Sequence, residues 1–273
     1  HQNESDYSDG YGSTSQDVLI PAFLAAYSGT TPNQQGLSPF MSMPKPNWRI
    51  TYNGLSKIKL LKKYFKTVTL SHAYRSTYSV SGFTSNLLFV GDQDGFPQSR
   101  DANANFIPEY QINTVTISEQ FSPLLNIDMT WNNSLQTRVE VKKDRSLSLS
   151  FSNNQLTEIR GSEYVVGAGY RFENVKFPIK FKRGKTIQSD LNLRADVSLR
   201  NNRTIIRKIV ENINQPTAGQ RVISIKISAD YVISQRLNLR LFYDRISTKP
   251  VISQSFPTAN TNAGLSIRFT LSS

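Results

Sequence analysis

The sequence predicts an all-β fold, an antiparallel transmembrane β-barrel with two short helices. Apolar and polar residues alternate over most of the chain from Trp48 onward, and alternation with a period of two is the pattern of a two-faced strand. The alternating runs are mostly about 11–14 residues long, whereas strands of soluble sandwiches have about 5–6 residues and membrane-barrel strands about 9–11. Their polar positions carry charged side chains, where a barrel lumen would hold water.

Residues 1–46 differ from the rest of the chain. They begin with a stretch rich in Ser, Asp, Gly and Tyr, and residues 18–27 then predict a short helix, with Asp17 as its N-cap and Gly29 near its end. Four prolines keep the remainder irregular. We therefore expect 1–46 to be an irregular, plug-like segment with one short helix, and 47–273 to form the barrel strands.

The alternation predicts about ten strands. In the clearest run, every odd position from Leu191 to Leu199 is apolar and every even position between them is polar. The expected strands cover residues 47–53, 66–80, 111–121, 126–142, 146–158, 162–173, 187–200, 220–233, 236–248 and 261–271. The range 126–142 also fits two strands that turn at residues 132–134, and the sequence leaves both readings open. Residues 54–64 predict the second helix.

Each strand of a membrane barrel turns one face to lipid and the other to the lumen. The charged residues expected to line the lumen are Arg138, Glu140, Arg171, Asp190, Arg194, Asp196, Lys226, Asp230, Arg240, Asp244 and Arg268. The residues expected to face lipid are Leu191, Leu193, Val197, Leu199, Ile225, Ile227, Tyr231, Leu239, Leu241, Tyr243, Leu265, Ile267 and Phe269.

One hairpin can be predicted in register. If residues 234–236 form a three-residue loop, Ile233 pairs with Leu237. The same register makes the pairs Asp230–Arg240, Lys226–Asp244, Ile227–Tyr243 and Ala229–Leu241. Two of these pairs bring opposite charges together, and each stabilises an exposed sheet by up to about 1 kcal/mol.

The composition argues against catalysis, cofactors and metal sites. The 273 residues include no Cys and only two His, one of them terminal, so thiolate and imidazole chemistry lack side chains. His72 shares the phase of Leu70, which predicts a wall residue. The net charge is +12, but the basic residues are dispersed, which disfavours nucleic-acid binding. The longest apolar run, 18–27, is too short for a membrane helix.

Two local features each allow two interpretations. Residues 92–95 (Asp-Gln-Asp-Gly) are either a plain turn, which we favour, or the beginning of a calcium loop that lacks its distal ligands. The basic stretch 176–185 (KFPIKFKRGK) is either a solvated turn, which we favour, or a site for lipid phosphates or an acidic partner.

Several segments are more specific than the alternation. They are PNWRITYNGLSKIKLLKKYF, SHAYRSTYSV, SLSLSFSNNQLTEI, GYRFENVKFPIKF, SDLNLRADVSLRNNRTIIRKI, GQRVISIKISADYVISQRLNLRLFYDR and SFPTANTNAGLSIRFTL. From about residue 17 onward the chain resembles the C-terminal portion of the SprA/Sov family, and 189–271 is especially similar. Members of this family are outer-membrane translocons of the type IX secretion system and are associated with gliding motility.

The resemblance implies the C-terminal part of a very large single-chain barrel in the bacterial cell outer membrane. Its function would be to export folded proteins without enzymatic activity. The implied partners are a PorV-type barrel at a lateral opening, a periplasmic plug protein, secreted cargo with C-terminal signal domains and outer-membrane lipids. Two alternatives remain, namely a smaller self-contained porin or receptor barrel and a soluble β-rich glycan-binding module.

The C-terminal strand of an outer-membrane barrel ends at the periplasm, and long loops lie outside the cell. We therefore expect 201–219 and 249–260 to be extracellular loops and 234–236 a periplasmic turn. The side of the long loop 82–110 stays open, because it depends on the number of strands between it and the C-terminus.

Overall fold

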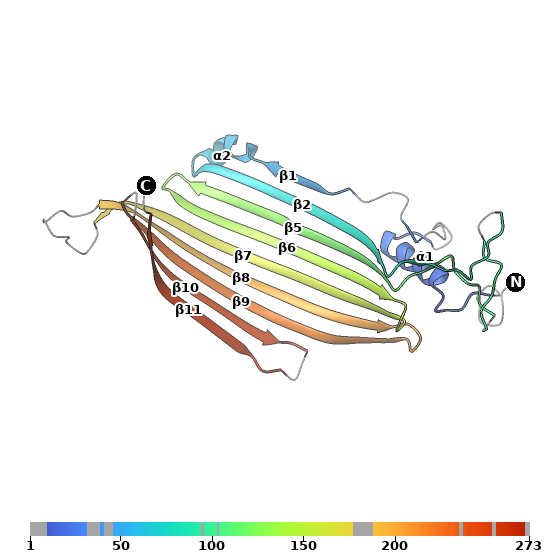
Figure 1. Cartoon of the computed structure of the whole chain (residues 1–273). Helices are drawn as coiled ribbons and strands as arrows, with labels where there is room; N and C mark the ends of the chain where they lie inside the picture. The colour runs from blue at the N-terminus through green and yellow to red at the C-terminus, as the bar shows by residue number, and fades with distance from the viewer. Residues whose placement is uncertain are drawn as a thin grey trace.

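The computed structural model describes residues 10–31, 39–40, 46–93, 96–102, 104–176, 188–234, 237–252 and 255–270. Nine strands form one antiparallel sheet in the order β1-β2-β5-β6-β7-β8-β9-β10-β11 (Figure 1). Their bounds are β1 Trp48–Tyr52, β2 Phe65–Ser81, β5 Thr114–Trp131, β6 Leu135–Ser150, β7 Gln155–Lys176, β8 Gln188–Lys208, β9 Ile213–Ser234, β10 Leu237–Pro250 and β11 Thr258–Phe269. Two further short strands, β3 (Thr84–Ser85) and β4 (Tyr110–Gln111), pair with each other.

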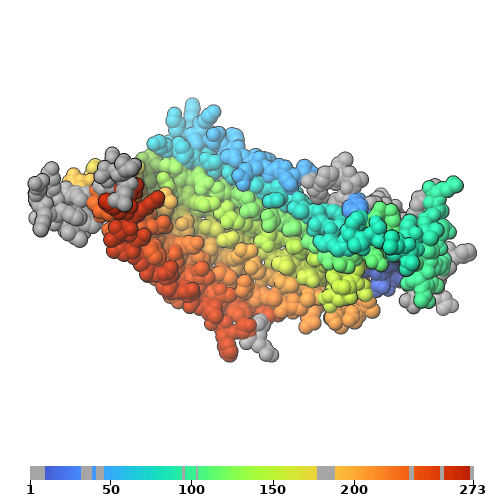
Figure 2. All heavy atoms as spheres, viewed as in Figure 1, coloured from blue at the N-terminus to red at the C-terminus, as the bar shows by residue number. Residues whose placement is uncertain are grey.

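Neighbouring strands of the large sheet follow one another in the chain, and the short strands β3 and β4 lie in the connection between β2 and β5. The spheres in Figure 2 accordingly run as one continuous surface from β1 to β11. Within the described residues, β1 and β11 are the two edges and do not pair with each other. The expected antiparallel sheet is therefore present, but it is open and does not close into a barrel.

The middle of the chain holds three strands where we expected four. β5 continues through Pro123, and the register shifts there between Phe121 and Leu125. Proline lacks an N–H and sits where a bulge interrupts the ladder, so it does not end the strand. The turns lie instead at 132–134 and 151–154, where Ser134 and Asn154 have positive φ. The two-strand reading of 126–142 is confirmed, whereas a single strand over 146–158 is wrong.

The expected loop 201–219 is mostly strand. β8 extends to Lys208 and β9 begins at Ile213, which leaves a turn of residues 209–212. The apolar alternation stops at Leu199, but backbone pairing continues beyond it. The expected loop 249–260 likewise shortens to 251–257.

Helix α1 (Gln16–Ser28) matches the expected helix but begins earlier. Ser15 occupies the N-cap position and Asp17 lies in the first turn, so the expected cap is wrong. Gly29 ends the helix with φ +71°, a left-handed conformation that glycine adopts without a steric cost. The expected helix 54–64 is a 3₁₀ turn, η2 (Gly54–Lys57), followed by one turn of helix, α2 (Lys59–Lys62). In the described part of the chain, no helix is long and apolar enough to cross a membrane.

The buried core lies at one end of the sheet, where α1 packs against it. Figure 1 shows the helix at this end, beside the connection between β2 and β5, while η2 and α2 lie at the opposite end. The core consists of Ile20, Phe23, Leu24, Ile112, Val115, Ile117, Leu147 and Leu149. α1 covers only this end of the face, and large apolar side chains farther along the strands stay exposed.

Candidate functional site

The strand register sorts the side chains onto two faces. We call one the apolar face, because all the residues expected to face lipid lie on it. The register connects them across the strands, for example in the row Leu191, Tyr231, Leu239 and Ile267. Seven of them are 36–64% exposed: Leu193, Val197, Ile227, Leu241, Leu265, Ile267 and Phe269. Tyr231 is buried, and its hydroxyl donates to the carbonyl of Val175 at 2.8 Å.

The other face is charged, and all the residues expected to line a lumen lie on it. The register aligns them in rows such as Asp196, Lys226 and Asp244, with Asp230 and Arg240 two rows away on the same face. Arg171 also donates from Nε to Asp190 at 3.1 Å on this charged face. The odd or even position of each residue along its strand therefore correctly predicted that these side chains share one face, from β6 to β11.

The predicted hairpin between β9 and β10 is confirmed in its charged and apolar pairs. Asp230 lies opposite Arg240, with 3.6 Å between Oδ1 and Nε. The pairs Lys226–Asp244, Ile227–Tyr243 and Ala229–Leu241 also face each other. The pair Ile233–Leu237 is wrong, because the register shifts at Leu237, which lies opposite Ser234. Residues 235–236 of the expected turn lie outside the described residues.

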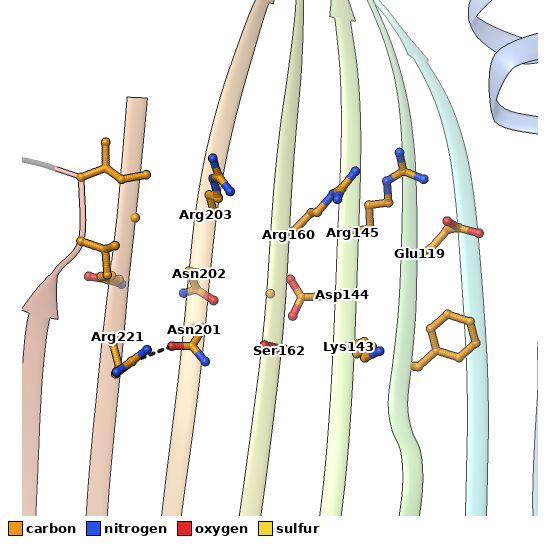
Figure 3. A pocket seen from close by; sticks show the side chains of 16 residues that line it. Glu119, Lys143, Asp144, Arg145, Arg160, Ser162, Asn201, Asn202, Arg203 and Arg221 are labelled. Atoms are coloured by element: carbon orange, nitrogen blue, oxygen red, sulfur yellow. Dashed lines mark hydrogen bonds between the residues drawn. The ribbon is translucent and has the colours of Figure 1, made fainter. Parts of the chain in front are cut away.

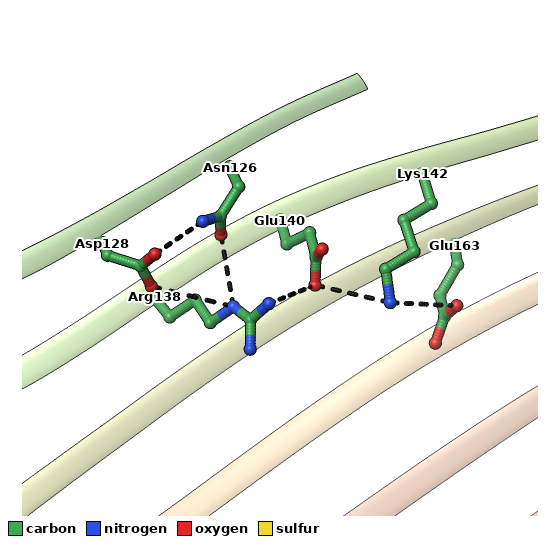
Figure 4. A network of polar contacts seen from close by, with 6 residues as sticks. All are labelled: Asn126, Asp128, Arg138, Glu140, Lys142 and Glu163. Atoms are coloured by element: carbon green, nitrogen blue, oxygen red, sulfur yellow. Dashed lines mark hydrogen bonds and ion pairs between the residues drawn. The ribbon is translucent and has the colours of Figure 1, made fainter. Parts of the chain in front are cut away.

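A polar network crosses β5, β6 and β7 on the charged face (Figure 4). Glu140, with a side chain only 6% exposed, accepts from Nη2 of Arg138 at 2.9 Å and lies 3.4 Å from Nζ of Lys142. Arg138 Nε also donates to Asn126 at 3.2 Å, and Lys142 lies 3.7 Å from Glu163. A carboxylate with so little exposure requires such partners. The charges of the network therefore compensate one another.

The sequence analysis missed part of this network. Asn126, Asp128, Lys142 and Glu163 were not among the expected site residues. Lys142 continues the even phase of Arg138 and Glu140, so extension of the alternation along β6 would have found it. The members on β5 and β7 become visible only once the register is known.

The charged face has no arrangement typical of catalysis. Glu140 and Asp190 contact arginines, and within the described residues no three His, Cys, Asp or Glu side chains gather where they could hold a metal ion. Asp92 accepts from the backbone N–H of Phe96 at 2.8 Å, but residues 94–95 of the suspected calcium loop lie outside the described residues. Residues 177–185 of the basic stretch also lie outside them.

His72 lies on the apolar face with Leu70, as its phase predicted. Its Nδ1 is 2.6 Å from the carbonyl oxygen of Leu124, in the bulged part of β5. This contact gives the imidazole a structural partner.

A second polar feature lies on the apolar face, between the exposed apolar residues and α1. A cavity of about 880 Å³ opens there, as Figure 3 shows. Five cationic side chains line it, contributed by four neighbouring strands: Lys143, Arg145, Arg160, Arg203 and Arg221. Glu119 is the acidic side chain on this face, whereas Asp144, which also borders the cavity, points to the charged face, where its Oδ1 lies 3.9 Å from Nη2 of Arg200. We call these five cations the basic rim.

The sequence analysis did not predict the basic rim. Apart from Lys143 and Arg145, its members stand far apart in the chain and lie on different strands. The fold assigns the chain to a structural class, that of open antiparallel sheets with one apolar and one charged face. No protein-family model and no curated protein matches the chain.

Proposed function

We propose that this chain forms part of the wall of a large outer-membrane β-barrel, a protein-conducting channel that exports folded proteins in type IX secretion and has no catalytic activity. The observation that carries the proposal is the uncovered apolar face, which extends over long strands whose opposite face is charged. A contiguous apolar surface of this extent is uncommon on a soluble monomer and is the normal outer surface of a membrane barrel.

The height of the apolar surface supports a membrane location. Leu191 and Leu199 lie eight positions apart on β8. At about 3.3 Å per residue this corresponds to about 26 Å along the strand. A tilt of about 40° reduces it to about 20 Å along the membrane normal, close to the apolar band of about 25 Å in outer-membrane barrels.

The charged face supports the conducting role. Its ion pairs and hydrogen bonds give a wetted wall that offers no specific chemistry to a passing protein. Nine strands enclose too narrow a space for folded cargo, so the proposed channel requires further strands. The PorV-type barrel, the plug protein and the cargo with C-terminal signal domains complete the proposal through the family resemblance.

The strand count supports an orientation for the loops. If β11 ends at the periplasm, the turns 209–212 and 251–257 are extracellular. The connection between β2 and β5, residues 82–113, lies at the same end of the sheet and is extracellular too. Helix α1 packs on the apolar face at this end, so it would lie outside the wall and would not fill the lumen as a plug.

A pair of neighbouring substitutions tests the membrane location. Val197→Arg places a charge in the middle of the apolar face, whereas Ser198→Arg places it on the charged face of the same strand. In a bilayer we expect Val197→Arg to cost about 2–4 kcal/mol and Ser198→Arg to be tolerated. Folding into vesicles, followed by heat-modifiable migration, measures both. Equal folding of the two variants would argue for the soluble glycan-binding alternative, because Val197 is already 47% exposed to water.

Gene deletion tests the secretion role. We expect the deletion strain to retain signal-bearing cargo in the periplasm, and the intact gene supplied in trans to restore secretion. Normal secretion in the deletion strain, together with outer-membrane location of the protein, would favour the porin or receptor alternative.

A further inference from the structure

We propose that the basic rim binds the phosphate groups of a phosphorylated glycolipid in the outer leaflet, while the acyl chains of that lipid lie on the apolar face. This inference rests on the proposed membrane location and identifies a lipid ligand for the outer surface of the wall.

The register places the rim in two adjoining rows across the sheet. One row of paired residues on the apolar face runs through eight strands, and we call it the interface row: Trp48, Tyr74, Phe121, Lys143, Ser162, Asn201, Arg221 and Lys249. Its first three members are aromatic rings in tilted contact, with centroids 4.5 and 4.8 Å apart. Aromatic and basic side chains are typical of a membrane–water interface. In strands tilted by about 40° such a row climbs about 3 Å per strand, so the rim cations of one row, on β6 to β9, lie within about 9 Å of one height.

The next row toward α1 brings three arginines together. Arg145, Arg160 and Arg203 lie directly opposite one another on β6, β7 and β8. Directly opposed like charges destabilise a sheet, because neighbouring strands are only about 4.8 Å apart. Such an arrangement favours an anion that bridges the guanidinium groups.

Among the described residues only part of this charge is neutralised, although Glu119 also lies opposite Arg145 in the same row. Glu158 lies between Arg145 and Arg160, with its Oε1 2.6 and 2.7 Å from their Nε atoms. Lys143 and Arg203 have no ion pair among the described residues. Among the same residues, Arg221 donates to the neutral side chain of Asn201, at 3.1 Å, and has no ion pair. These three exposed cations remain available, and the arginine fork matches a phosphate group in two hydrogen bonds.

The position of the rim identifies the ligand as a lipid. The row next to the interface row, on the side away from α1, is apolar and contains Val141, Tyr164, Leu199 and Ile223. Two residues along a strand span about 6.6 Å, the scale of a headgroup above its acyl chains. A soluble inorganic anion would gain nothing from this adjoining apolar surface. The rim also lies toward the end of the sheet that is proposed to be extracellular, where the lipids are in the outer leaflet.

The test measures lipid A binding to the full-length protein purified in detergent. The probes are bisphosphorylated lipid A and the same lipid without its phosphates. We expect the phosphorylated form to bind about tenfold more tightly or better, because charged hydrogen bonds to at least one phosphate are gained. The variant Lys143→Gln/Arg203→Gln should lose this preference, since it removes two rim cations and leaves the contacts of Glu158 intact.

The matched control is Arg194→Gln/Arg268→Gln, which removes two positive charges from the charged face. We expect it to keep the wild-type preference. The inference is overturned if wild type binds both lipid forms equally, if the rim variant keeps the preference, or if the control loses it as well. Competition by millimolar inorganic phosphate as effective as that by lipid A would also overturn it in favour of a soluble-anion site. Outer-membrane fractionation is a separate measurement, so a failure of the membrane proposal is distinguishable from a failure of the lipid site.

Discussion

The environment of Asp17 shows how one carboxyl group makes the stability of α1 depend on pH. Burial raises the pKa of Asp17 above its ordinary value of 3.8. The folded state therefore binds this proton more readily than the unfolded state does. The free energy of unfolding then decreases as the pH rises from 3.8 through the raised value, and the loss persists above it.

We predict that Asp17→Asn stabilises the protein at neutral pH, because the amide carries no charge to bury. Urea unfolding at pH 4 and pH 7 measures the effect, and the difference between the two pH values should be smaller in the variant than in wild type. An unchanged difference would assign the pH dependence to other groups.

The Glu140 network makes a second prediction at the residue scale. Arg138→Ala leaves a carboxylate of 6% side-chain exposure with Lys142 at 3.4 Å as its remaining ion-pair partner. We expect a loss of about 1–2 kcal/mol in the free energy of unfolding, kept modest because Arg138 itself is 48% exposed. Arg194→Ala, on the same face and without an ion pair among the described residues, should cost less. Equal losses would contradict a stabilising role for the network.

At the scale of elements, the β9–β10 hairpin offers a direct measurement of a cross-strand ion pair. A double-mutant cycle with Asp230→Ala and Arg240→Ala should give a coupling of about 0.2–1 kcal/mol that weakens with added salt. The exchanged pair, Asp230→Arg with Arg240→Asp, should recover most of the coupling. A cycle with no coupling at low salt would show that the 3.6 Å contact does not contribute to stability.

Elements were predictable from the sequence where two independent signals agreed. The hairpin register followed from charges and apolar residues that both required the same pairing. The boundaries of β5, β6 and β7 did not follow, because Pro123 looks like a turn residue in sequence but is part of a bulge in the paired strand. The far halves of β8 and β9 were missed for a related reason. Polar side chains there stand on the apolar face, so the alternation stops while the backbone pairing does not.

The two candidate sites also differed in how far the sequence predicted them. The charged residues that were expected to share one face do so, because parity within a single strand decides which side a residue faces, although four members of the Glu140 network were missed. The basic rim required the relative register of four strands, and nothing within any one strand reveals it. The sequence also does not predict where α1 packs. The positions of Phe23 and Leu24 indicate an apolar helix face, but they do not indicate which end of the sheet this face contacts.

At the scale of the whole molecule, the two tryptophans mark opposite ends of the apolar face. Trp48 lies in the interface row and Trp131 at the far end of β5, packed on Phe65 with ring centroids 4.4 Å apart. On β2, Phe65 pairs with Trp131 and Tyr74 pairs with Trp48. These two β2 residues are nine positions apart, about 30 Å along the strand. In a bilayer, the two indoles would therefore lie in opposite interfaces.

We predict shallow quenching of both tryptophans by brominated lipids. The variants Trp48→Phe and Trp131→Phe, each of which keeps one indole, should be quenched by bromines near the headgroup and weakly by bromines near the chain ends. An aqueous quencher outside sealed vesicles should reach only one of the two. Deep quenching of either indole would be inconsistent with the proposed span.

The open edges of the sheet have a consequence for assembly. Along β11, a row of amide and carbonyl groups has no partner strand on its outer side within the described residues, and each such group would cost several kcal/mol in hydrocarbon. In the proposed barrel, entry into the bilayer and completion of the ring would therefore be one coupled event. A strand that pairs with β11 must also have two different faces, with apolar side chains beside Leu265, Ile267 and Phe269 and polar side chains at the positions between them. That requirement is a template against which any candidate closing strand can be compared.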